Sequence, residues 1–226
     1  MKNVMLIAIA VLAIPATGYA QDASNWAGFY AGATATGVNA NSSSMGVGGF
    51  FEGAPEEFSS LYDSAPQGAV SGIRAGYNLN LGSGWLAGVE GSLNFGAISG
   101  AIDDPVSANE NDQITSKLDQ SREFTARIGY VAGKTLIYGL AGLANARTSI
   151  SLDDETVLDS ESLSLKGRVF GVGVEQMLTS KLSMSLEYLH MDYGTNTFFA
   201  DQADGNYALD ADVTSDSIRV GVNYRF

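Results

Sequence analysis

Eight stretches of the chain alternate apolar and polar residues, and this alternation limits the fold more than any other feature of the sequence. In the last stretch, RVGVNYRF, Val220, Val222, Tyr224 and Phe226 fall on one face of an extended strand, while two arginines fall on the other. Each stretch has 11–13 residues, enough for the roughly 9–11 that a tilted strand needs to cross a bilayer. The stretches lie at 26–37, 69–81, 85–97, 121–131, 135–147, 167–177, 182–192 and 216–226.

The segments between these stretches are alternately short and long. Three tight turns are predicted at 82–84, 132–134 and 178–180, and four polar loops at 38–68, 98–120, 148–166 and 193–215. An even strand number with short periplasmic turns and longer extracellular loops is typical of a bacterial outer-membrane barrel. The sequence therefore predicts an all-β fold, an eight-stranded antiparallel up-and-down transmembrane barrel with long extracellular loops and short periplasmic turns.

The charged residues decide which face of each strand points inward. An arginine on the lipid face near the midplane would cost about 2–4 kcal/mol, so the charged face must line the lumen. Four arginines and four glutamates then share the interior, where buried charges need partners. The predicted lumen charge network is Arg74, Glu90, Glu123, Arg127, Glu175, Glu187, Arg219 and Arg225.

The same rule predicts the register of the hairpins. Outward residues are expected at odd numbers in the second and third stretches, and at even numbers in the fourth to seventh. Each tight turn should then hold three residues, a common hairpin class, and Arg74 should lie diagonal to Glu90. The first stretch stays unassigned, because Trp26, Phe29 and Tyr30 straddle both faces.

The ends of the chain carry two further signals. Residues 1–20 have a lysine, a short apolar run and small residues before Gln21, which predicts a secretory signal peptide and a barrel at 21–226. Its removal takes away Lys2 and no acid, so the net charge moves from −13 to −14, which disfavours nucleic-acid binding. Trp85, Tyr130, Tyr224 and Phe226 fall at the predicted periplasmic ends, where an aromatic girdle is expected.

Several segments resemble a known family. WAGFYAGATATG, GVEGSLNFG, GVGVEQML, LEYLHMDYG and the closing RVGVNYRF are similar to the small outer-membrane β-barrel proteins of Gram-negative bacteria, the porin-like and opacity-like surface antigens related to the membrane domain of OmpA. The resemblance implies location in the cell outer membrane, contact with its lipids and lipopolysaccharide, and a last strand that the outer-membrane assembly machinery reads at Tyr224 and Phe226.

The predicted function is a structural or surface-interaction role in the envelope, because side chains fill an eight-stranded lumen. In one interpretation, the paired charges plug the lumen and the barrel has a structural role. A low-conductance porin that passes small ions or solutes is the alternative, since charged rings can select ions.

Residues with catalytic or ligand chemistry are few. His190 is the single histidine and is expected to point outward near the extracellular rim, whereas Ser185 and Glu187 point inward. A catalytic triad from these three is therefore excluded, and the sequence predicts no enzyme and no required cofactor. Two ligand-binding alternatives remain: haemin iron held by His190 and Tyr193, and a cation or a host ligand held by acidic loops such as DQADGNYALDAD at 201–212.

Overall fold

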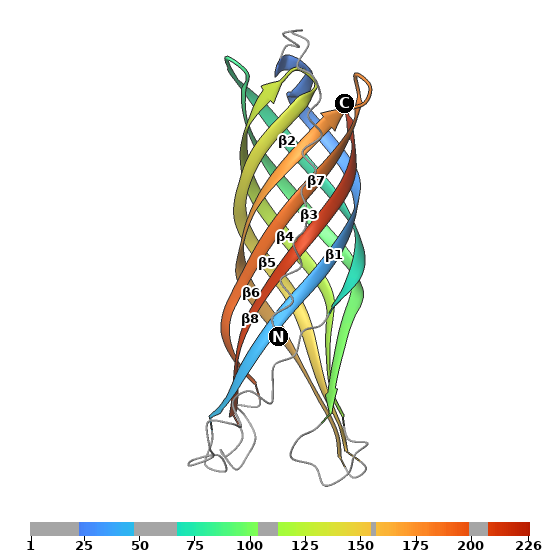
Figure 1. The fold of residues 1–226 in the computed structure, drawn as a ribbon, viewed down its shortest axis with the longest axis vertical. Coiled ribbons are helices and arrows are strands. Elements are labelled where there is room, and N and C mark those ends of the chain that lie inside the picture. Colours follow the sequence, from blue (N-terminus) through green and yellow to red (C-terminus); the bar gives the residue numbers. More distant parts are fainter. Residues whose placement is uncertain (1–22, 48–66, 104–112, 155–156, 199–207) are drawn as a thin grey trace, which may run out of the picture.

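The computed structural model describes residues 23–47, 67–103, 113–154, 157–198 and 208–226. They form one closed antiparallel barrel in which each strand pairs with the next along the chain and the last pairs with the first (Figure 1). The predicted eight-stranded up-and-down fold is confirmed. A 3-10 turn, η1 (Ala23–Trp26), precedes the strands β1 (Gly28–Val47), β2 (Gln67–Gly82), β3 (Trp85–Asp103), β4 (Gln113–Ala132), β5 (Thr135–Asp154), β6 (Val157–Met177), β7 (Leu182–Phe198) and β8 (Ala208–Arg225).

The outer surface of the barrel is a band of apolar side chains. On six strands, β2, β3, β4, β6, β7 and β8, these residues are the ones expected to face lipid, and most of them are 40–78% exposed in the isolated chain. Such exposure would be costly in water and is what a lipid environment stabilises. The band includes Ile73, Tyr77, Val89, Leu93, Phe124, Ile128, Phe170, Val172, Leu186, Tyr188, Val220 and Val222.

Strand β5 faces the opposite way from the prediction. Ile137 and Leu143 are exposed, whereas Leu136 and Tyr138 are buried inside the barrel. The predicted three-residue turn at 132–134 is wrong, because Ala132 pairs with Thr135 and leaves two residues in the turn. The charge rule failed here because β5 carries no charge before Arg147, so both of its faces are apolar or small.

The other two hairpins keep the predicted facing, but their turns do not hold the three residues predicted either: Gly82 pairs with Trp85, which leaves two, and Met177 pairs with Ser183, which leaves five. Tyr77 lies opposite Val89 across β2 and β3, and an irregularity in the pairing between Asn80 and Gly82 absorbs one residue before the turn. Val172 lies opposite Tyr188 across β6 and β7. The two outer faces therefore stay in register through these turns.

The strands run farther than the alternation predicted. β5 continues to Asp154 and β6 starts at Val157, so nearly all of the loop predicted at 148–166 is strand. The other three predicted loops also lose residues to strand at both ends. Outside the bilayer no lipid face is needed, so polar segments such as SLDD lose the apolar alternation while the backbone pairing continues. The remaining loop residues, and the predicted signal peptide, lie outside the described residues.

The start of the barrel turns into the lumen. Trp26 ends η1 and is fully buried, so the strand predicted from residue 26 begins instead at Gly28, which adopts a φ of 104°. This left-handed backbone favours glycine. Tyr30 then faces inward and Phe29 outward, which assigns the first strand. No described helix is long and apolar enough to span a bilayer.

Candidate functional site in the barrel lumen

The candidate site is a network of charged side chains that fills the interior. It draws on β2, β3, β4, β6, β7 and β8, because inward positions on these strands alternate with the lipid-facing ones. Each of its members is at most 6% exposed. The residues are the eight predicted from sequence: Arg74, Glu90, Glu123, Arg127, Glu175, Glu187, Arg219 and Arg225.

Glu175 forms ion pairs with two arginines. It lies near the tight-turn end of the barrel, which is periplasmic in outer-membrane barrels. Its carboxylate lies 2.6 Å from Arg225 Nη2 and 3.4 Å from Arg127 Nη1. Ser183 Oγ and Asn223 Nδ2 also donate hydrogen bonds to it. Four donors surround one buried carboxylate, so its charge is fully compensated.

Arg74 joins the two sides of the lumen at mid-height. Its guanidinium lies 2.8 Å from Glu187 Oε1 on β7 and 3.6 Å from Glu90 Oε2 on β3. Arg74 Nε also donates to Asn223 Oδ1 on β8 over 2.8 Å. Tyr30 Oη donates to Glu90 over 2.7 Å. The diagonal Arg74–Glu90 pair expected from the register is therefore present, and a stronger partner lies across the lumen.

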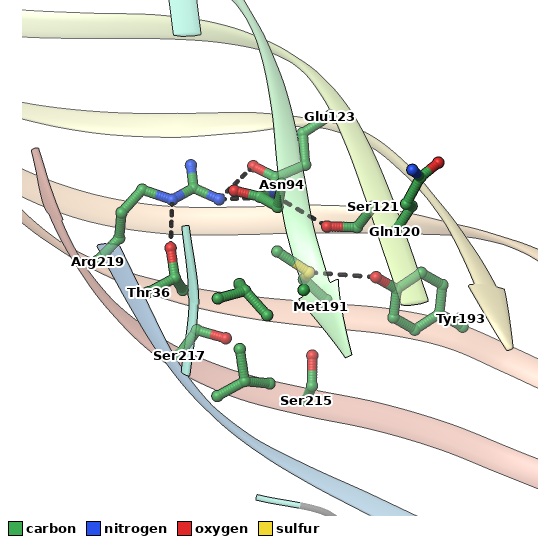
Figure 2. A pocket seen from close by; sticks show the side chains of 13 residues that line it. Thr36, Asn94, Gln120, Ser121, Glu123, Met191, Tyr193, Ser215, Ser217 and Arg219 are labelled. Carbon is green, nitrogen blue, oxygen red and sulfur yellow. Dashed lines mark hydrogen bonds and ion pairs between the residues drawn. The ribbon is translucent and has the colours of Figure 1, made fainter. Parts of the chain in front are cut away.

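Toward the other end, Arg219 holds Glu123 with one nitrogen, Nη2, at 2.6 and 2.7 Å from the two carboxylate oxygens. Arg219 Nε donates to Thr36 Oγ1, and Asn94 donates to Glu123 (Figure 2). The cavity beside them measures about 30 Å³, room for one or two water molecules. This cavity is therefore smaller than a hydrated ion requires.

Trp26 lies fully buried at the tight-turn end of the lumen. Its indole ring lies 4.5 Å from the Arg225 guanidinium carbon, a cation–π distance. Its carbonyl oxygen accepts hydrogen bonds from Asn78 Nδ2 and Arg225 Nη1. These contacts tie η1 to the charge network.

The sequence reasoning missed an apolar half of the lumen. Beside the charges, the neighbouring strands β5, β6 and β7 contribute most of a buried apolar cluster inside the barrel. The available signal was the run TLIYGLAGLANA, which is apolar on both faces and so leaves no polar side for the interior. The cluster includes Leu136, Tyr138, Leu140, Leu165, Val169, Leu189, Met191 and Tyr193.

The residues considered for catalysis lie on opposite sides of the barrel wall. His190 points outward, with Nδ1 2.9 Å from Asp216 Oδ1. Ser185 and Glu187 point inward, and both contact Arg74. The structure therefore agrees with the exclusion of a triad from these three residues.

The same geometry removes the haemin hypothesis for its two proposed ligands. Tyr193 is buried in the lumen, where its hydroxyl contacts Met191 sulfur, whereas His190 is half exposed on the outside. One iron cannot reach both side chains through the wall, so the prediction that His190 and Tyr193 together hold a haemin iron is wrong. Among the described residues no metal-ligating cluster occurs; residues 201–207 of the acidic stretch lie outside them, and 208–212 belong to β8.

Aromatic side chains mark the periplasmic rim. Trp85 and Tyr130 meet edge to face at 5.5 Å on β3 and β4, and Tyr224 and Phe226 do so at 5.3 Å at the end of β8. All four are exposed. Their position at the tight-turn end is that of an interfacial girdle.

Comparisons with known proteins place this architecture in a family. Residues 6–226 match the outer membrane protein beta-barrel domain. A 31 kDa outer-membrane immunogenic protein of Brucella melitensis is 29% identical over 91% of this chain and 85% of its own. A 22 kDa outer membrane protein of Rhizobium leguminosarum is 28% identical over 89% and 80%.

A solved structure has the same fold. The outer membrane protein OprG from Pseudomonas aeruginosa aligns with a TM-score of 0.54 at 16% identity, covering 88% of this chain and 96% of that one. The strand order, the apolar outer band and the family match all indicate an outer-membrane β-barrel. The chain belongs to the outer membrane protein beta-barrel domain family and resides in the cell outer membrane.

Proposed function

We propose that this protein is a closed anchor of the outer envelope, with a plugged lumen and a role carried by its outer and extracellular surfaces. The observation that supports it best is the pairing inside the barrel: every arginine of the network lies within 4.0 Å of a glutamate. Breaking one buried pair costs about 3–5 kcal/mol. An ion pathway would need several such pairs to open together.

The alternative of a low-conductance porin fits the lumen less well. Selectivity rings work when charges face a water-filled path. Here the arginines and glutamates face each other, the cavity beside Arg219 measures only about 30 Å³, and Trp26 is fully buried against Arg225 at the tight-turn end. We therefore expect no steady permeation.

Vesicles test this directly. Proteoliposomes that contain the refolded protein should retain a small trapped anion or cation as well as protein-free vesicles do. Vesicles with an open sixteen-stranded porin should release it rapidly. Release from the vesicles with this protein, at a rate that grows with the amount incorporated, would contradict the plugged lumen.

The surface-interaction part of the proposal concerns the extracellular loops. Relatives named immunogenic outer-membrane proteins are consistent with loops that outside molecules can reach. Asp and Glu residues are frequent in the sequence segments predicted as extracellular loops. A deletion strain and a complemented strain, compared for binding of host cells, cations and surface ligands, would measure what these loops do.

We also propose that the aromatic end of β8 is the signal for assembly. Phe226 is 78% exposed, and its backbone N–H donates to Phe29 O over 3.1 Å, beside the seam that closes the barrel. A side chain with so little packing contributes little to the folded state. It remains accessible to a folding factor.

Deleting Phe226 should lower the amount of folded protein in the outer membrane severalfold, yet barely change the stability of protein refolded in lipid. Phe29→Ala is the matched control, because Phe29 is 67% exposed and contacts Tyr77 edge to face. It should leave membrane levels near normal. Normal outer-membrane levels of the truncated protein, read from unheated gels of membrane fractions, would refute the assignment.

A further inference from the structure

Four basic side chains gather on one part of the outer wall. Arg122 on β4, Arg147 on β5, and Lys166 and Arg168 on β6 are all exposed. They share the outward faces of their strands with Phe124, Leu143 and Phe170. The chain has only 12 lysines and arginines and a net charge of −13. Such a concentration of cations on three adjacent strands is therefore a marked local reversal of charge.

The register places these cations close together. Arg122 lies opposite Asn145, and Asn145 lies opposite Lys166, so the three form one row across β4, β5 and β6. Since neighbouring strands are about 4.8 Å apart, the Cα atoms of Arg122 and Lys166 are about 10 Å apart. Arg147 and Arg168 flank the row, two residues along their strands on either side of it.

The cations of this basic patch are not ion-paired among the described residues, although one acid, Asp192, is a cross-strand neighbour. None of the four makes an ion pair with another described residue. Asp192, opposite Arg168 on β7, instead accepts a hydrogen bond from the Gly194 backbone N–H over 2.9 Å. Like charges on neighbouring strands destabilise a sheet. An external anion would relieve that repulsion.

The position of the patch along the membrane normal indicates where such an anion would bind. Arg122 is eight residues from the girdle residue Tyr130 along β4. At about 3.3 Å per residue and a tilt of about 40°, this corresponds to roughly 20 Å along the membrane normal. The apolar band of such barrels is about 25 Å tall. Arg122 therefore lies about 5 Å inside the extracellular edge of the band. A long basic side chain can span that distance and reach the headgroups of the outer leaflet.

We propose that Arg122, Arg147, Lys166 and Arg168 form a binding site for the phosphate groups of lipopolysaccharide. Phosphates lie at that level of the outer leaflet, and guanidinium groups match phosphate oxygens bidentately. Phe124 and Phe170 lie two residues nearer the periplasmic end than Arg122 and Arg168 on the same outward faces, and Leu143 lies directly opposite Arg168. These apolar side chains can pack against the acyl chains of the same molecule. One bound lipopolysaccharide molecule thus contacts the cations through its phosphates and the apolar side chains through its acyl chains.

Binding of labelled lipid A to the full-length protein, refolded in detergent micelles, tests the site. Arg122→Gln with Lys166→Gln should weaken binding of diphosphorylated lipid A about tenfold. The matched control is Lys134→Gln with Lys181→Gln, which removes two exposed cations from the periplasmic turns and should leave binding unchanged. Unheated gel mobility establishes that each variant is folded.

The probe chemistry separates the sources of binding. Dephosphorylated lipid A should bind the wild type as weakly as diphosphorylated lipid A binds the double variant, and inorganic phosphate at millimolar concentration should not compete. Equal binding of diphosphorylated lipid A by the wild type and the double variant would overturn the proposal. So would equal binding of the dephosphorylated form by the wild type, or full competition by inorganic phosphate.

Discussion

Replacing Glu175 with glutamine is expected to lower the free energy of unfolding by about 3–5 kcal/mol. Glu175 is completely buried and lies within ion-pair distance of both Arg225 and Arg127. Glutamine keeps the volume of the side chain, so the loss reports the missing charge. Two guanidinium groups would remain inside the barrel with less compensation.

Urea unfolding of the barrel in lipid vesicles, followed by mobility on unheated gels, measures this loss. Asp192→Asn is the control, because Asp192 is exposed and the amide oxygen can still accept from Gly194; it should change stability by less than about 0.5 kcal/mol. Adding Arg225→Gln to Glu175→Gln should restore part of the stability, since one unpaired cation is removed. Wild-type stability of the single Glu175 variant would contradict the network.

Replacing Gly142 with valine is expected to cost about 3 kcal/mol or to prevent folding, because the site has no room for a side chain. A Cβ atom on Gly142 would come within 3.0 Å of backbone atoms of Phe124 and Thr125 on β4. Backbone in a paired strand cannot move aside as a flexible side chain can. The β4–β5 pairing itself would have to shift.

The matched control for this steric prediction is Gly91→Val. A Cβ atom there meets nothing within 4 Å, and the residue is exposed on β3. Its refolding yield, read as the fraction of fast-migrating protein on unheated gels, should stay near that of the wild type, while the Gly142 variant should yield little. Comparable yields from the two variants would show that the barrel tolerates bulk at the β4–β5 contact.

The sequence predicted the barrel because lipid imposes a strict physical rule. Wherever a strand carried a charge near the midplane, as at Arg74, Glu123 and Glu187, the charge had to face inward. Strand β5 carries no such residue before Arg147, and its facing was predicted wrongly. Beyond the bilayer this rule no longer applies, so the alternation did not predict the strand extensions past residues 37 and 147.

The members of the lumen network followed from alternation, but most of their partners did not. Arg74 and Glu90 belong to one hairpin, so their proximity follows from local register. Arg74 and Glu187 are 113 residues apart and meet only because the barrel closes. Trp26 is a similar case: its burial depends on η1 folding back over Arg225, which no periodicity in the sequence predicts.

Single-channel recording in planar bilayers tests the plugged lumen most directly. We predict that the refolded wild-type protein, inserted in amounts verified by gel mobility, gives no steady conductance steps above the baseline of protein-free membranes. The reason is that the four arginines and four glutamates remain paired at both membrane polarities. Large, long-lived openings that scale with the amount of inserted protein would show that ions pass the network, and would contradict a closed barrel.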